Sequence, residues 1–157
     1  LRLQAFVPAE RHDYRLVYSL FRHNAFWQRS SRTTTEWAFS SQRPEGDHEV
    51  TPLLSVDYDL RLSETNTAPG GKPFSFDLGF RMPPEVVVRP LARVSVEVSW
   101  DGGATWTALD ARGCLKKKSC TVELKNQRSG SASFRVSAAD TAGRAVTQTV
   151  IDAYAVD

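Results

Sequence analysis

The sequence has little of several features that would point to particular classes of protein. Lysine and arginine (20) nearly balance aspartate and glutamate (18) among 157 residues, so the net charge of +2 gives no electrostatic footprint for nucleic acid. No apolar run approaches the roughly 18 residues that a membrane-spanning helix requires. We therefore expect no nucleic-acid partner and no membrane span.

The sequence also lacks the usual constellations of catalytic side chains. Its three histidines, His12, His23 and His48, lie in the N-terminal third among charged or loop-like neighbours. There is no Gly-x-Ser-x-Gly elbow, and RSGSAS (128–133) is typical of a turn that enters a strand. We assign no catalytic residue and expect this fragment not to be an enzyme.

Cysteine is scarce too, with Cys114 and Cys120 enclosing a lysine-rich segment in GCLKKKSC. Their spacing fits neither a CxxC redox motif nor a zinc site, which would need further ligands nearby. We predict a local disulfide across a hairpin neck, with two free thiols on adjacent strands as the alternative. A structural disulfide indicates an oxidising compartment, so we expect a secreted protein.

Short segments of alternating apolar and polar residues are abundant. They are rich in Val, Phe, Trp, Tyr and Thr and are bounded by Gly, Pro, Asn or Asp. No window carries a 3.6-residue apolar stripe with helix caps. The predicted strands are 14–20, 33–41, 53–62, 73–80, 92–100, 120–125, 131–138 and 144–156. The chain is predicted to be all-β.

The spacing of these strands suggests a domain boundary. From about residue 50 the strands follow one another closely, which predicts an immunoglobulin-like or fibronectin type III-like antiparallel β-sandwich over 50–157. Residues 1–44 supply only two or three extra β-strands, too few to bury a core alone. We expect these strands to end a preceding domain or to pack against the C-terminal sandwich.

Alternation also predicts which side chains point into the sandwich. Ser95, Glu97 and Arg135 cannot all be buried without partners, so the apolar residues between them should face inward. The predicted inward residues are Val94, Val96, Val98, Phe134 and Val136.

The stretch SWDGGATW (99–106) matches the Asp-box of sialidases at Ser99, Asp101, Gly103, Thr105 and Trp106. In this pattern the carboxylate accepts backbone N–H bonds, the glycines permit positive φ, and the tryptophan forms the apolar underside of the hairpin. In sialidase-like proteins the motif recurs in successive propeller blades, away from the catalytic cleft. It occurs once here, in a chain too short for a propeller. We predict a structural turn.

Two carboxylates are candidate metal ligands. Asp57 and Asp59 lie two apart on a predicted strand, so they project from the same face. With Asp101 or Asp140 nearby they could hold calcium, which prefers oxygen ligands. We favour a solvent-facing acidic pair and otherwise expect no cofactor.

Two further features are candidate binding surfaces. Lys116, Lys117 and Lys118 could contact an anionic extracellular polymer or an acidic partner, although a charged hairpin tip more often keeps sheet edges apart. Trp27, next to Phe26, resembles the exposed aromatics of sugar-binding modules, and is equally compatible with a core position.

Several segments, read in order from about Tyr14 to Tyr154, resemble the C-terminal region of large secreted subtilisin-like serine proteases of actinobacteria. They are TTTEWAFSSQRP, PLLSVDYDLRL, TNTAPGG, VSVEVSWDGGATW and SFRVSAADTAGRAVTQTVIDAY. The CLKKKSC segment departs from that pattern.

This resemblance implies a non-catalytic accessory domain that stabilises, spaces or targets an upstream catalytic domain of the same polypeptide. That domain would carry the Asp, His and Ser of the protease, and an extracellular polymer or protein substrate would be a further partner. The alternative is a carbohydrate- or cell-wall-binding module of a secreted hydrolase. Two or three aromatic side chains on one open face would favour that alternative.

Overall fold

The computed structural model describes residues 6–22, 29–115 and 119–157. Its strands are β1 (His12–Phe21), β2 (Arg32–Ser41), β3 (Ser55–Asp59), β4 (Thr67–Ala68), β5 (Pro73–Arg81), β6 (Leu91–Ser99), β7 (Thr107–Leu109), β8 (Ser119–Lys125), β9 (Gly130–Asp140) and β10 (Ala145–Val156). A single-turn 3-10 helix, η1 (Arg112–Leu115), precedes β8. In these ranges no helix is long and apolar enough to cross a bilayer.

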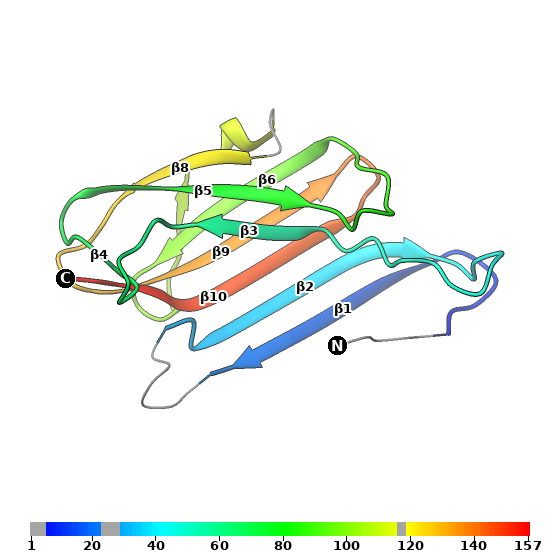
Figure 1. Cartoon of the computed structure of the whole chain (residues 1–157), viewed down its shortest axis with the longest axis horizontal. Helices are drawn as coiled ribbons and strands as arrows, with labels where there is room; N and C mark the ends of the chain where they lie inside the picture. The colour runs from blue at the N-terminus through cyan, green and yellow to red at the C-terminus, as the bar shows by residue number, and fades with distance from the viewer. Residues whose placement is uncertain (1–5, 23–28, 116–118) are drawn as a thin grey trace.

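The described strands form two sheets that pack face to face (Figure 1). The smaller sheet has the order β3-β5-β8, and the larger has the order β1-β2-β10-β9-β6-β7. The short β4 pairs with β10 in parallel, and the pairings along both sheets are antiparallel. The predicted all-β sandwich is therefore confirmed.

The distribution of strands between the sheets matches the predicted sandwich class. After the short β4 is set aside, the first, second and fifth strands of the region from residue 50 onward (β3, β5 and β8) share one sheet. The third, fourth, sixth and seventh (β6, β7, β9 and β10) share the other. Immunoglobulin-like domains likewise keep the first, second and fifth strands in one sheet and the third, sixth and seventh in the other, although constant-type domains place the fourth strand with the first group.

The core lies between the sheets and is built by strand alternation. Four of the five residues predicted to point inward are buried, and Val94 packs against them from the rim. The buried four are Val96, Val98, Phe134 and Val136. On the opposite, outer face of the larger sheet, Arg135 Nε donates to Glu97 Oε2 at 2.6 Å. The sequence pattern thus set the facing of β6 and β9 correctly.

Aromatic rings fill the centre of the core. The Phe134 ring lies 4.8 Å from that of Phe76 and 5.8 Å from that of Tyr154, centroid to centroid. The buried Tyr154 hydroxyl donates to Asn126 Oδ1 at 2.8 Å, and Asn126 Nδ2 donates to the carbonyl oxygen of Pro69 at 3.0 Å. These bonds give the buried Tyr154 hydroxyl and the buried Asn126 amide their partners.

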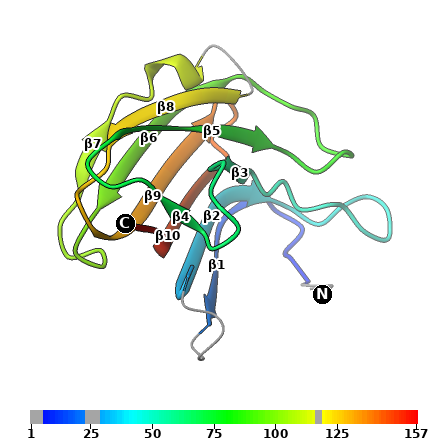
Figure 2. The ribbon, with the colours of Figure 1, turned by 60° about the vertical axis from the view of Figure 1, so that its left-hand side comes forward.

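The N-terminal strands lie in the same sheet as the sandwich. β2 pairs with β10, with Trp37 opposite Val146, and β1 pairs with the far side of β2. The Trp37 indole N–H donates to the carbonyl oxygen of Leu54 at 2.9 Å, which ties β2 to the segment that enters the smaller sheet. The β1–β2 hairpin extends beyond the cover of the smaller sheet (Figure 2). That residues 1–44 also end a preceding domain stays a prediction.

Candidate functional site

The SWDGGATW turn joins β6 to β7 and closes around the Asp101 carboxylate. Thr105 donates to it twice, through its hydroxyl to Oδ2 at 2.6 Å and through its backbone N–H to Oδ1 at 2.9 Å. The Ser99 hydroxyl donates to Oδ1 at 2.7 Å and accepts the backbone N–H of Gly103 at 2.9 Å. Asp101 is therefore bonded within its own turn.

Trp106, the last residue of the turn, bonds back to its middle: the indole N–H donates to the carbonyl oxygen of Gly103 at 3.0 Å. Gly103 has φ +92°, which favours glycine, and a Cβ there would lie 2.9 Å from Cδ1 of Ile151, so that side chain would have to shift. The Arg135 guanidinium stacks on the Trp106 ring, 4.6 Å from its centroid. Trp106 is only half-buried, because it lies beside Arg135 on the outer face, so it forms a less enclosed underside than the motif predicts.

The electrostatics of the turn favour a permanent negative charge. The Thr105 hydroxyl, the Thr105 N–H and the Ser99 hydroxyl together hold the pKa of Asp101 well below its ordinary value. A general acid must carry a proton near the working pH, and a base must have a free lone pair directed at its substrate. Asp101 stays charged, and three of its lone pairs accept bonds from the turn, an arrangement suited to holding the turn together.

A second acidic turn joins β9 to β10. Asp140 Oδ1 accepts the backbone N–H groups of Ala142 and Arg144 at 2.9 and 3.0 Å. Its Oδ2 accepts Arg144 Nε at 2.6 Å, and Arg144 Nη2 donates to the carbonyl oxygen of Val87 at 3.0 Å. The signal available in the sequence was the Asp-x-x-x-Arg spacing across a glycine in DTAGR. The burial of the Asp140–Arg144 pair could not be predicted from that spacing.

The proposed calcium ligands are engaged elsewhere. Arg81 donates to both oxygens of Asp57, at 2.8 Å from Nη2 to Oδ1, and this pairing lowers the pKa of that carboxyl. Asp59 is exposed and accepts the backbone N–H of Arg61 at 3.3 Å. In the described ranges no group of three or more His, Cys, Asp or Glu side chains is placed to hold a metal ion. The two carboxylates considered as further ligands belong to the turns described above.

The predicted disulfide between Cys114 and Cys120 is confirmed, with Cα atoms 4.8 Å apart. Its setting differs from the predicted hairpin neck, because Cys114 lies in η1 and only Cys120 lies in a strand, β8. Cys114 is fully buried and Cys120 nearly so. The bond thus anchors η1 to the smaller sheet.

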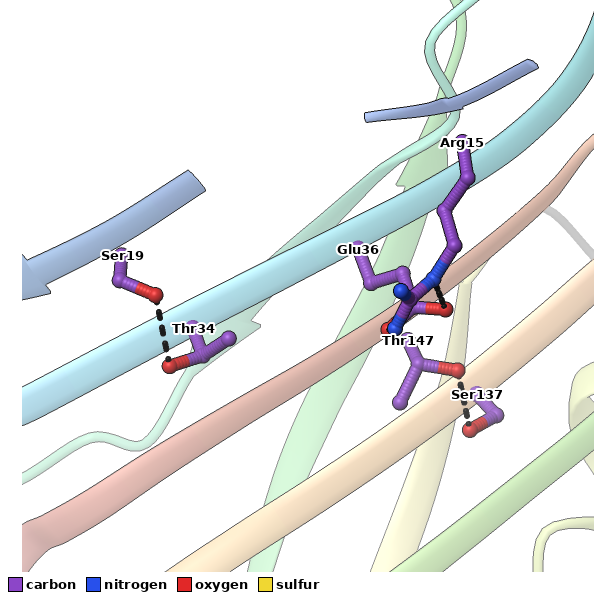
Figure 3. A network of polar contacts seen from close by, with 6 residues as sticks. All are labelled: Arg15, Ser19, Thr34, Glu36, Ser137 and Thr147. Atoms are coloured by element: carbon purple, nitrogen blue, oxygen red, sulfur yellow. Dashed lines mark hydrogen bonds and ion pairs between the residues drawn. The ribbon is translucent and has the colours of Figure 1, made fainter. Parts of the chain in front are cut away.

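The outer face of the larger sheet is covered by polar side chains that bond to one another (Figure 3). The pairs drawn there are Arg15 with Glu36, Ser19 with Thr34, and Ser137 with Thr147. Hydrogen bonding to Arg15 also lowers the pKa of Glu36. This arrangement stabilises a solvated sheet face, since each group finds its partner on a neighbouring strand.

Some predicted site residues lie outside the described residues. They are Lys116, Lys117, Lys118 and Trp27, together with the neighbouring Phe26 and with His23. The described histidines His12 and His48 are both exposed.

Comparison with known proteins identifies no relative for this arrangement. No protein-family model, no curated protein and no solved structure matches the chain.

Proposed function

We propose that this chain is a non-catalytic accessory β-sandwich of a secreted protein, which stabilises, spaces or targets a catalytic domain of the same polypeptide. The sequence resemblance makes that domain a subtilisin-like serine protease. The fold alone would not support an accessory role, because sandwiches of this class serve many functions.

One observation carries the proposal: the acidic side chains best placed to do chemistry are used to hold turns and strands together. Asp101 is bonded by its own turn, Asp140 by Arg144, and Asp57 by Arg81. A catalytic carboxylate needs a pKa matched to its task and an oxygen free for substrate. Carboxylates used in this way are expected of a scaffold.

The positions of the described tryptophans weigh against the alternative of a carbohydrate-binding module. Trp37 and Trp100 pack against the core, and Trp106 has the guanidinium of Arg135 stacked on its ring. A sugar-binding platform needs two or three aromatic faces open to solvent on one side, whereas the exposed Tyr18 and Phe21 of β1 project to opposite sides of the sheet. The accessory-domain proposal is therefore the better supported of the two.

The gene that encodes this segment provides the first test. We expect it to encode, upstream of Leu1, a domain with the Asp, His and Ser of a subtilisin-like protease. The purified chain alone should hydrolyse neither peptide nor sialoside substrates and should not react with a fluorophosphonate probe for serine hydrolases. A gene that encodes no hydrolase, or turnover by the chain alone, would contradict the proposal.

The full polypeptide then tests the accessory role itself. Asp140→Ala should destabilise the sandwich, so peptidase activity should be lost at a lower temperature while kcat/KM at low temperature is unchanged. Asp59→Ala, at an exposed position on β3, is the matched control and should change neither quantity. Equal thermal inactivation of the two variants would show that the sandwich does not support the catalytic domain.

A further inference from the structure

The sheet edges of this molecule are protected to very different degrees. An unprotected edge exposes unpaired N–H and C=O groups, and proteins usually shield it with charged residues or by keeping the strand short. Edge strand β7 has three residues, β3 carries Asp57 and Asp59, and β8 carries Glu123 and Lys125. Each of these three edges thus has a recognised form of protection.

Strand β1 is the exception. It is ten residues long, it pairs only with β2 in the described structure, and it has no charged residue or proline from Leu16 to Phe21. Three of its large apolar side chains are exposed: Val17 and Tyr18 at 47% each and Phe21 at 69%. This half of β1 has both the free backbone groups and the apolar side chains that a pairing strand would use.

The side chains of β1 divide into two sets. Tyr14, Leu16, Tyr18 and Leu20 lie on the same side as Trp37, toward the core, and Tyr14 stacks on Phe39 with centroids 5.9 Å apart. The other set, which includes Arg15, Val17 and Ser19, lies on the outer face. The core-side set is symmetric about Val17, with two members on each side of it.

We propose that β1 is the site at which a second copy of this chain adds to the larger sheet, with the two β1 strands antiparallel and related by a two-fold axis at Val17. This register places Leu16 opposite Tyr18 and Tyr14 opposite Leu20 of the other copy. Aromatic and aliphatic side chains therefore face each other across the new strand pair, which is a favourable arrangement.

The charges of β1 select the antiparallel arrangement. Its charged residues, Asp13 and Arg15, lie in its N-terminal half. Parallel pairing in register would place each of them opposite the same charge on the other copy, which is destabilising. In the antiparallel register Arg15 faces Ser19 and Asp13 faces Phe21, so no like charges are opposed. On the outer face, Arg15 and Ser19 flank the central pair of Val17 side chains.

The proposed contact is small compared with stable protein interfaces. A stable interface uses about 20 to 30 residues from each partner, whereas β1 offers ten. We therefore expect weak association that becomes visible only at high protein concentration.

Sedimentation velocity of the purified chain, from about 1 µM to about 1 mM, tests the proposal. The wild type should pass from monomer to dimer, and β1 amides should exchange more slowly as the dimer forms. Val17→Lys and Val17→Glu should each weaken association by about tenfold or more, because two like charges meet at the axis. An equimolar mixture of the two variants should restore it, because opposite charges then meet.

Val88→Lys is the matched control, since Val88 is also exposed (54%) but lies in the loop before β6. It should dimerise like the wild type. A chain that stays monomeric throughout the range would overturn the proposal, as would a dimer that Val17→Lys leaves unchanged. A mixture of the two Val17 variants that fails to associate would exclude this register and its axis.

Discussion

Asp140 and Arg144 form an ion pair at the β9–β10 turn, with Oδ2 and Nε 2.6 Å apart and side chains that are 1% and 12% exposed. Two backbone amides and the carbonyl oxygen of Val87 complete their bonding. A charge pair this well buried adds little net stability, but each charge needs its partner, because an unpaired buried charge is costly.

Removing one partner of this pair should therefore be costly. Asp140→Ala leaves the Arg144 guanidinium buried without its counter-ion, and we expect the free energy of unfolding to fall by about 3 to 5 kcal/mol. Urea denaturation followed by tryptophan fluorescence measures the change. A loss below about 1 kcal/mol would show that water replaces the carboxylate and that the pair is unimportant.

The two glycines of the SWDGGATW turn should respond differently to alanine. Both have positive φ, +69° at Gly102 and +92° at Gly103, so each substitution carries about 1 to 2 kcal/mol of backbone strain. Only at Gly103 would the new Cβ meet another side chain, at 2.9 Å from Ile151. Gly103→Ala should cost about 1 to 3 kcal/mol more than Gly102→Ala, measured by urea denaturation of both. Equal costs would mean that Ile151 moves aside freely.

Reduction of the Cys114–Cys120 bond should weaken the fold without unfolding it. The bond closes a ring of seven residues, for which chain entropy gives about 2 kcal/mol. Urea denaturation with and without a phosphine reductant should show a loss of that size. Retention of the far-UV circular dichroism spectrum at zero urea is the control. Complete unfolding on reduction would show that the bond does more than restrict the unfolded chain.

The sequence predicts strands well because alternation is a local property. The segments that contain Val96 and Phe134 alternate strongly, and both residues face the core as expected. The pairing of Trp37 with Val146 could not be predicted, because it joins strands more than a hundred residues apart and depends on which sheet edge is free. The position of Cys114 in a 3-10 turn was missed because a single turn has no periodicity to detect.

Candidate sites were harder to predict than strands. Asp101 could be placed in a turn from the motif around it, since its partners are neighbours in sequence. Asp57 was considered as a metal ligand because its partner, Arg81, lies on the next strand of the sheet and is invisible to local spacing.

Two tyrosines with buried hydroxyls, Tyr58 and Tyr154, should affect stability differently when the hydroxyl is removed. Burial raises the pKa of both Tyr58 and Tyr154 above the ordinary 10.0, so the folded protein holds their protons more tightly than the unfolded chain does. Because ionisation favours the unfolded chain, the stability of the fold is unaffected by these groups below about pH 10 and falls as the pH rises further. At neutral pH, Tyr154→Phe should cost about 1 to 3 kcal/mol, because it removes the bond to Asn126.

Tyr58→Phe is the matched control, because the buried Tyr58 hydroxyl has no hydrogen-bond partner in the described structure. This variant should be at least as stable as the wild type at pH 7 and should lose less stability above pH 10. Urea midpoints between pH 7 and 11 provide the measurement. A Tyr58→Phe variant less stable than the wild type would indicate a partner for that hydroxyl.

Acidic residues of this chain hold the fold together, and Asp101→Ala measures that role at the SWDGGATW turn. Its pKa is depressed in the folded protein, so its contribution is present above the ordinary value of 3.8 and is lost as the pH falls below it. Urea denaturation at pH 7 and at acid pH, beside a glycan-binding screen at pH 7, compares Asp101→Ala with the wild type. We expect a lower urea midpoint at pH 7, a smaller difference at acid pH, and no change in glycan binding. An unchanged midpoint together with the loss of glycan binding would instead show that SWDGGATW is a binding site and that Asp101 does not stabilise the fold.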